Sequence, residues 1–371
     1  WIKKLSFLLA GMGWTVLSFA QNAQPTNLQC EYLVNPIGLD AATPRLLWQM
    51  SDNRNGACQS AYQVIVSSDS LNVANGSGDY WDTGKINGAA RLVTYAGKTL
   101  QPFTKYYWTV ALWDKDQQKT ALAPVASFET GMMQINNWKG EWISDSKDVA
   151  LKSAPYFRKE FRPSGKVKSA RLYMAAAGLY EISVNGKRVG DHRLDPMYTR
   201  FDRRTLYVTY DVTSLVNATD VVLGVLLGNG WYNHQSTAVW YFDKAPWRDR
   251  PKFCLDLRIT YQDGHEDIIK SGTDWKTSLS PIVFNSIYTA EHHDARLSQP
   301  GWDKPGFDDS KWKNTIPVNS PSQNIVAQQL HPIRFVEEIK PVKETKLSAL
   351  KTVFDLGRNI SGISRISVKG E

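Results

Sequence analysis

The stretch GLYEISVNGKRVG, residues 178–190, decides the fold class of this chain. Apolar and polar side chains alternate along it as far as Val184, which is typical of a β-strand with one buried and one solvated face. Asn185-Gly186 follows, and such a pair favours a tight turn because glycine relieves the Cβ clash at positive φ. The stretch therefore predicts a β-hairpin.

The same pattern recurs on both sides of this hairpin. Short runs rich in β-branched and aromatic residues alternate with turn residues, and helical periodicity is nearly absent after the first twenty positions. Many short strands with few helices are typical of β-sandwiches rather than of alternating strands and helices. The runs are residues 62–67, 106–111, 221–226, 255–261 and 363–368, and further turn pairs are Asn229-Gly230 and Asp263-Gly264.

The first 20 residues predict a signal peptide. Lys3 and Lys4 precede an apolar stretch, and small residues stand at Ser18 and Ala20. We therefore expect export to the periplasm or the cell exterior, with no membrane span after cleavage; the alternative is a buried core helix. Because the chain starts with Trp1 and stops at Glu371 inside a strand-rich unit, we expect a fragment of a longer protein.

Composition narrows the functional classes. The 44 basic and 36 acidic residues are interspersed, so a nucleic-acid surface is not predicted despite a net charge of +8. The 14 Trp and 16 Tyr residues favour large cores or sugar-facing surfaces. Cys30, Cys58 and Cys254 match no metal motif, and we expect buried thiols, with a Cys30–Cys58 disulfide as the alternative.

Four groups of motifs, in chain order, resemble the N-terminal region of bacterial α-L-rhamnosidases of glycoside hydrolase family 78. They cover nearly all of the chain after the signal. They are NPIGL (35–39) with PRLLW (44–48), WDTG (81–84) and YWTV (107–110); residues 178–190 with GNGWY (228–232); YTAEHHDARL (288–297) with GW (301–302) and FDD (307–309); and PIR (332–334) with FDLGRNISG (354–362).

The resemblance implies an all-β chain of tandem β-sandwiches. Residues 28–132 would form a fibronectin-III-like domain and residues 133–325 a jelly-roll, carbohydrate-binding-like domain. The polar segment 319–324 ends the second, and residues 326–371 would start a further, truncated β-sandwich. An (α/α)6 barrel, expected beyond Glu371, would carry the catalytic carboxylates.

This layout implies that no catalytic residue lies in the chain and that the fragment is inactive. The parent enzyme would hydrolyse terminal α-L-rhamnose from oligo- or polysaccharides with inversion, and it would need no cofactor. An inverting pair of carboxyl groups lies roughly 6.5–9.5 Å apart. Nothing in the sequence places any two of the candidate acids at that distance, namely Glu181, Asp195, Asp202, Glu291 and Asp294.

Sugar binding is the function we expect of the chain itself. The apolar face of a pyranose packs on Trp or Tyr, and its hydroxyls bond to planar polar groups such as amides. Residues 229–234 (NGWYNH) offer both, although a core role for Trp231 stays open. The candidate contacts are Tyr180, Glu181, Asn229, Trp231, Tyr232 and Trp240.

A calcium ion is implied only by the resemblance, because some family members bind rhamnose through calcium in this sandwich. Glu181 and the carbonyl of Asn229 would supply hard oxygen ligands. The alternative is that Glu181 pairs with an arginine or a backbone amide of a neighbouring strand. Adjacent His292 and His293 would point to opposite faces of a strand, so we do not expect them to share a metal.

Two other segments have competing interpretations. Asp294-Ala-Arg296 is expected to form a structural corner, as the resemblance implies. Tyr198, Arg200 and Asp202 lie in a solvated loop or, alternatively, make a second sugar contact.

Two other whole-chain interpretations stay open. One is a free-standing carbohydrate-binding protein or adhesin with fibronectin-like and lectin-like sandwiches. The other is the front half of a different glycosidase with the same sandwiches. The coding sequence downstream of Glu371 would discriminate these hypotheses.

Overall fold

The computed structural model describes residues 23–217, 219–234, 237, 240–367 and 369. The chain forms two compact units: the first extends to Gly190 and resumes at Leu194–His331, and the second joins Asp191–Arg193 to the residues from Pro332 onward. The predicted signal peptide lies outside the described residues. Within the part of the chain that is described, no helix is long and apolar enough to cross a membrane.

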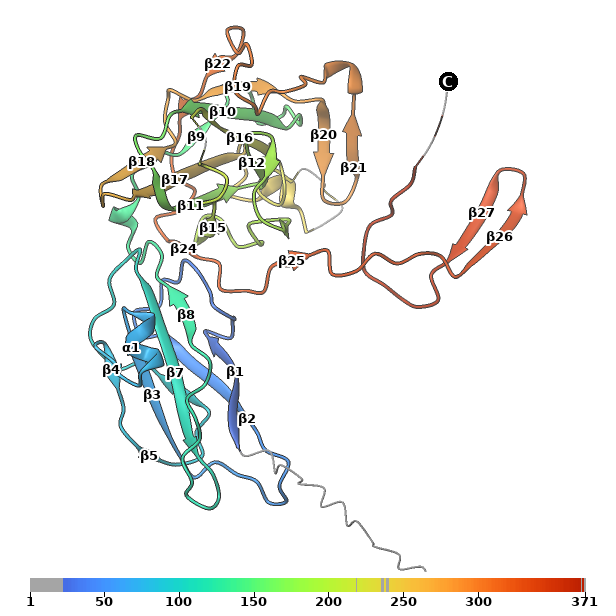
Figure 1. Ribbon diagram of the computed structural model, residues 1–371. Coiled ribbons are helices and arrows are strands. Elements are labelled where there is room, and N and C mark those ends of the chain that lie inside the picture. The colour runs from blue at the N-terminus through green and yellow to red at the C-terminus, as the bar shows by residue number, and fades with distance from the viewer. Residues whose placement is uncertain (1–22, 218, 235–236, 238–239, 368, 370–371) are drawn as a thin grey trace, which may run out of the picture. The chain divides into compact units, whose positions relative to one another are not determined.

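The first unit begins with a β-sandwich, drawn in blue to teal in Figure 1. Trp48 from one sheet and Tyr106 and Trp108 from the other belong to one buried core, in which Tyr106 stacks on Phe128 at 5.4 Å. Its three-stranded sheet has the order β1 (Gln24–Cys30), β2 (Arg45–Ser51), β6 (Leu92–Thr94). Its five-stranded sheet has the order β4 (Trp81–Asp82), β3 (Ala61–Ser67), β7 (Lys105–Trp113), β8 (Ala126–Glu129), with β5 (Ile86–Asn87) also paired to β3.

A second, larger sandwich follows in the same unit. One hydrophobic core joins its sheets, with Leu172 and Met174 from one and Ile182 and Val225 from the other. The six-stranded sheet has the order β13 (Lys187–Arg188), β12 (Leu179–Val184), β16 (Val221–Gly228), β10 (Pro155–Phe161), β19 (Lys276–Leu279), β22 (Lys313–Asn314). The seven-stranded sheet has the order β23 (Ile316–Pro317), β9 (Ile143–Ser144), β17 (Lys252–Tyr261), β11 (Val167–Ala177), β15 (Thr205–Asp211), β24 (Ile325–Ala327), with β18 (Glu266–Lys270) paired to β17.

The hairpin predicted at residues 178–190 is present. Strands β12 and β13 are antiparallel, with Val184 opposite Lys187. The two turn residues, Asn185 and Gly186, have φ values of 50° and 77°. Positive φ at both positions is the requirement that Asn-Gly meets in a two-residue hairpin turn.

The remaining elements are short. The α-helix α1 (Ser70–Ala74) is capped by the Asp69 side chain, which accepts a hydrogen bond from the Leu71 amide. Among the described residues there are three 3₁₀ helices, η1 (Ile135–Asn137), η2 (Phe242–Lys244) and η3 (Ala295–Leu297). A separate hairpin joins β20 (Ile282–Ser286) to β21 (Ala290–His293).

The second unit contains two-stranded sheets in its described part. They pair β14 (His192–Arg193) with β25 (Ile333–Arg334), and β26 (Lys343–Ser348) with β27 (Lys351–Asp355). The strand predicted at residues 363–368 is wrong for residues 363–367, which pair with no strand of the described chain. A β-pattern forms a strand only where a neighbour supplies backbone partners.

The predicted all-β class of tandem β-sandwiches is confirmed. The cysteine prediction is correct only in part. Cys30 and Cys254 are buried free thiols, whereas Cys58 is free and exposed, and no Cys30–Cys58 disulfide forms. Burial raises the pKa of the Cys30 and Cys254 thiols well above the usual value.

Candidate carbohydrate-binding site

The loop between β16 and β17 is anchored by Asn229, which is buried. Its side-chain amide donates to the carbonyl oxygens of Lys152, at 2.9 Å, and Asn285, at 3.1 Å. Its amide oxygen accepts a hydrogen bond of 3.1 Å from Asn233 Nδ2. The side-chain polar atoms of Asn229 thus hold the loop in place, so we do not include this predicted candidate among ligand contacts.

The turn after Asn229 requires glycine. Gly230 has a φ of 50°, and a Cβ there would lie 3.0 Å from the backbone nitrogen of Leu179. The chain therefore passes close to β12 at this point before Trp231, which is partly exposed.

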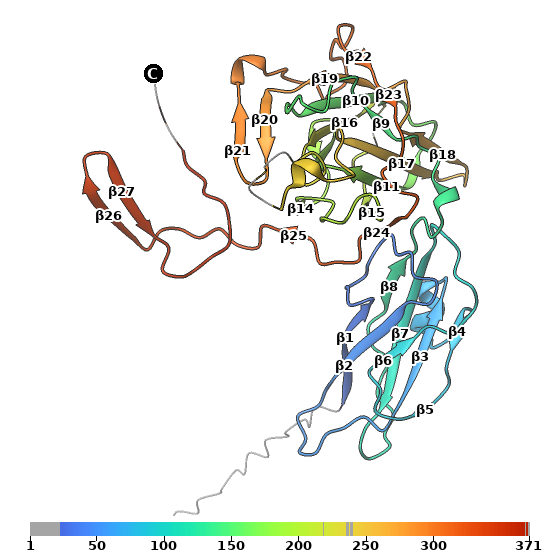
Figure 2. The same ribbon diagram turned by 180° about the vertical axis from the view of Figure 1, so that it is seen from behind.

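Five aromatic residues from three separate segments meet beyond this turn, and we call them the aromatic loop cluster. Trp231 lies at their centre, with ring centroids 5.5 Å from Tyr198, 5.4 Å from Phe242 and 5.6 Å from Tyr288. Trp247 packs on Phe242 at 5.9 Å. Tyr198 precedes β15, Tyr288 lies in the β20–β21 turn, and the other three belong to the β16–β17 loop, whose gold 3₁₀ helix lies beside the β20–β21 hairpin in Figure 2.

Two further aromatic residues stand at the edge of the cluster and face solvent. Trp240 is 80% exposed and Tyr241 is 67% exposed. Both have left-handed backbone conformations, with φ values of 45° and 55°. This conformation is unfavourable for bulky residues, and such strain is concentrated at binding sites. Trp240 is thus a predicted candidate that the structure places where a ligand can reach it.

His234 lies beneath the cluster and is only 1% exposed. Its ring is 5.7 Å from Trp231 and 5.6 Å from Tyr288, and neither ring nitrogen has a hydrogen-bond partner among the described residues. Burial and the nearby Lys152 ammonium lower the pKa of His234. Burial, together with Arg248 and Arg250, lowers the pKa of Lys152 to about 8.

Two predicted candidates lie in the interior instead. Tyr180 is 6% exposed, belongs to the sandwich core, and its hydroxyl lies 3.1 Å from that of Tyr210. Tyr232 is buried, and its ring packs against Phe201 at 5.2 Å. The alternation rule could have indicated Tyr180, because it shares the inward face of β12 with Ile182 and Val184.

Glu181 is exposed on the outer face of β12. Its carboxylate pairs with Arg188 of the neighbouring strand β13 at 3.2 Å. This ion pair is the alternative to a metal role that the sequence left open. The carbonyl oxygen of Asn229 accepts a hydrogen bond from the Asn233 amide at 3.1 Å. Within the described residues there is no cluster of three or more His, Cys, Asp or Glu side chains suited to a metal. Glu181 and Asn229 therefore do not fit a calcium site.

Other polar residues singled out in the sequence have partners within the fold. Asp195 accepts a hydrogen bond from the Tyr210 hydroxyl at 2.9 Å. Asp202 pairs with Arg200 at 3.0 Å. Asp294 caps η3 and pairs with the Arg296 guanidinium at 2.7 Å, in agreement with a structural corner.

The two adjacent histidines do not form a joint site. The His292 ring packs on Phe284 at 5.0 Å, whereas His293 lies opposite Ile282 in the β20–β21 hairpin. Tyr288, in the turn of this hairpin, is the contributor that the sequence did not reveal. Its motif was visible, but its contact with Trp231 is long-range and no spacing rule predicts it.

Two family models match the chain. Residues 25–134 match a "Rha78A-like, N-terminal immunoglobulin domain", and residues 165–337 match an "Alpha-L-rhamnosidase N-terminal domain". An α-L-rhamnosidase of Formosa agariphila is 32% identical over 364 residues, covering 90% of this chain and 38% of that protein. One from an Alteromonas species is 32% identical over 366 residues, covering 95% of this chain and 39% of that protein.

Solved structures of similar proteins agree in fold. An α-L-rhamnosidase from Dictyoglumus thermophilum matches with a TM-score of 0.81 and 36% identity, over 90% of this chain and 38% of that one. The Streptomyces avermitilis α-L-rhamnosidase complexed with L-rhamnose matches with a TM-score of 0.83 and 25% identity, over 91% of this chain and 49% of that one. This chain thus spans 38–39% of the two relatives described above.

Proposed function

The chain belongs to the α-L-rhamnosidase family, in which it corresponds to the N-terminal region, and on this premise we propose that it is the non-catalytic accessory part of a secreted enzyme. That enzyme would remove terminal α-L-rhamnose from glycans with inversion. The catalytic carboxylates would lie in the remaining part of the protein, since the relatives are much longer than this chain. The two sandwiches would support the catalytic part and help to retain substrate.

We propose that substrate is retained at the aromatic loop cluster, with Trp240 and Tyr241 as the solvent-facing contacts. The observation that carries this proposal is the exposure of two adjacent aromatic rings on a strained backbone. A monosaccharide stacked on one ring would bind with roughly millimolar affinity, which corresponds to about −4 kcal/mol. Such a weak contact still retains a polymer when several contacts act together.

The test is rhamnose binding to the purified chain and to Trp240→Ala, measured by NMR titration. Loss of the stacked ring should weaken binding about tenfold, because an aromatic contact of about 1 kcal/mol and its buried area are removed. Tyr32→Ala, which removes an exposed aromatic ring from the first sandwich, should leave the affinity unchanged. Equal affinities for a folded Trp240→Ala variant and the wild type would exclude Trp240 from the site.

We propose that Trp231 supports the binding site from within the cluster. It orders Tyr198, Phe242 and Tyr288 around itself, so Trp231→Ala should also weaken rhamnose binding about tenfold or more. Comparing the two variants distinguishes a residue that contacts the sugar from one that holds the loops in place. Trp231→Ala should lower the melting temperature, and Trp240→Ala should not.

Export is supported by the basic and apolar composition of residues 1–20. N-terminal sequencing of the protein recovered from the culture medium or periplasm should begin shortly after Ala20. Recovery of the uncleaved chain in the cytosol would contradict the proposal.

A further inference from the structure

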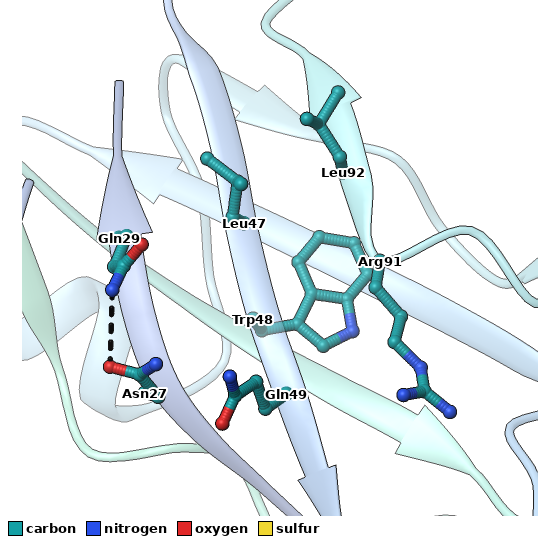
Figure 3. A pocket seen from close by; sticks show the side chains of 7 residues that line it. All are labelled: Asn27, Gln29, Leu47, Trp48, Gln49, Arg91 and Leu92. Atoms are coloured by element: carbon teal, nitrogen blue, oxygen red, sulfur yellow. Dashed lines mark hydrogen bonds between the residues drawn. The ribbon is translucent and has the colours of Figure 1, made fainter. Parts of the chain in front are cut away.

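A concavity lies at the three-stranded sheet of the first sandwich (Figure 3). It has a volume of about 340 Å³. Its apolar lining consists of the buried Trp48, the half-buried Leu47 and the exposed Leu92. The polar lining consists of Asn27, Gln29, Gln49 and Arg91.

The backbone of β1 is adapted to present two of these side chains. The pairing of β1 with β2 shifts between Thr26 and Gln29, which inserts one extra residue into β1. Asn27 lies within this bulge and has a φ of 50°. Its exposed side chain accepts a hydrogen bond of 3.3 Å from Gln29 Nε2. Such bulges re-aim side chains and are frequent beside binding sites.

The polar lining has an excess of hydrogen-bond donors. The exposed Arg91 guanidinium forms no hydrogen bond or ion pair with any described residue, and neither does the Gln49 amide. No carboxylate lines the concavity. Glu31, at the end of β1, is bound to Arg45 by hydrogen bonds of 2.5–3.2 Å. Arg91 is thus a cation without a counter-ion beside three neutral amides.

We propose that this concavity binds an acidic glycan and recognises the carboxylate of a uronic acid residue. A guanidinium presents parallel N–H donors that match the two oxygens of a carboxylate. The amides of Asn27 and Gln49 would bond to neighbouring hydroxyls, and Leu47 and Leu92 would contact the apolar face of the ring. That the ligand is a glycan rests on the proposed function; its negative charge rests on Arg91.

The experiment compares a trigalacturonate with its methyl ester, which has the same sugar rings without the charge. Calorimetry with the whole chain should detect the acidic oligosaccharide and at least tenfold weaker binding of the ester, because charge-assisted bonds to the guanidinium are lost. Arg91→Gln should weaken binding of the acidic oligosaccharide by a similar factor. Arg91→Lys should weaken it by less, because lysine keeps the positive charge but lacks the paired N–H donors of the guanidinium. Arg203→Gln removes a comparably exposed guanidinium from the second sandwich and should change nothing.

The outcomes separate this site from the aromatic loop cluster. Trp240→Ala should leave galacturonate binding intact, and Arg91→Gln should leave rhamnose binding intact, so either site can fail alone. Equal affinity for acid and ester, or unchanged acid binding by a folded Arg91→Gln variant, would overturn the proposal. Preferential binding of an acidic peptide over the galacturonate would identify a protein partner instead and would also overturn it.

Discussion

His234 is a buried residue whose surroundings differ from those of an ordinary core histidine. It has aromatic rings on several sides, while both ring nitrogens lack partners among the described residues. A buried polar group without a partner costs about 1–3 kcal/mol. An unsatisfied buried group in a native structure calls for a specific explanation, and a binding role for the loops around His234 would supply one.

We expect the pH dependence of stability to report on His234. Its pKa in the folded chain is lowered by burial and by Lys152, so the stability that the neutral ring contributes is present above the unfolded pKa of about 6.5. It is lost as the pH falls through the lower, folded pKa. His234→Phe removes this titration, and the difference in unfolding free energy between variant and wild type should grow as the pH falls below about 6.5.

The same variant should be more stable than the wild type at pH 7.5, by about 1 kcal/mol, because two unpaired buried nitrogens are removed and an aromatic ring remains. Urea denaturation followed by tryptophan fluorescence measures both effects. His331→Phe, at an exposed histidine, is the matched control and should not reproduce the effect. A destabilised His234→Phe variant at pH 7.5 would show that the imidazole does have a polar partner.

At the scale of elements, local patterns predicted two of three hairpin turns, whereas the third pair, Asn229-Gly230, begins the long loop between β16 and β17, which lie in different sheets. Asn185-Gly186 and Asp263-Gly264 both lie between paired antiparallel strands, because the turn requirement is met by two neighbouring residues. The strand at 363–368 and the meeting of Tyr198, Trp231 and Tyr288 depend on distant partners, which no local pattern contains. The sequence therefore indicated Trp231 and Trp240 but could not distinguish them from the buried Tyr232.

Gly186→Ala should destabilise the second sandwich by about 1 kcal/mol, because its φ of 77° is unfavourable for a residue with a Cβ. The nearest neighbour of the added Cβ would be the flexible end of Lys304, at 2.7 Å, so backbone strain rather than packing should dominate. Gly272→Ala is the control, since its φ is ordinary and its surroundings leave room for a Cβ. Thermal unfolding measures both, and equal shifts in melting temperature would contradict the assignment.

At the scale of the whole molecule, the described part of the chain consists of β-sandwiches and short two-stranded sheets. The carboxylates singled out in the sequence, apart from the exposed Glu291, are paired with arginines or tyrosine hydroxyls. Inverting hydrolysis requires one free carboxylate to activate water and one carboxylic acid to protonate the leaving group. The family resemblance implies that this pair lies outside the N-terminal region, and that division of roles is the one we propose.

The purified chain should therefore release no p-nitrophenol from p-nitrophenyl α-L-rhamnoside. The control is a full-length relative assayed beside a heat-killed sample of this chain. Turnover by this chain above the heat-killed control, retained after repurification, would contradict the non-catalytic role that we propose.

The three unpaired cysteines give the chain a single convenient attachment point. Burial keeps Cys30 and Cys254 protonated and out of reach, whereas Cys58 is open to solvent. A maleimide dye should consequently label the native protein once, in the first sandwich, without any engineered substitution. The attachment point lies near Arg91, because Gln59, next to Cys58, donates a hydrogen bond of 2.8 Å to the carbonyl oxygen of Ala90. A change in the emission of that dye on addition of an acidic oligosaccharide would therefore follow occupancy near Arg91 in real time, independently of any event at Trp240.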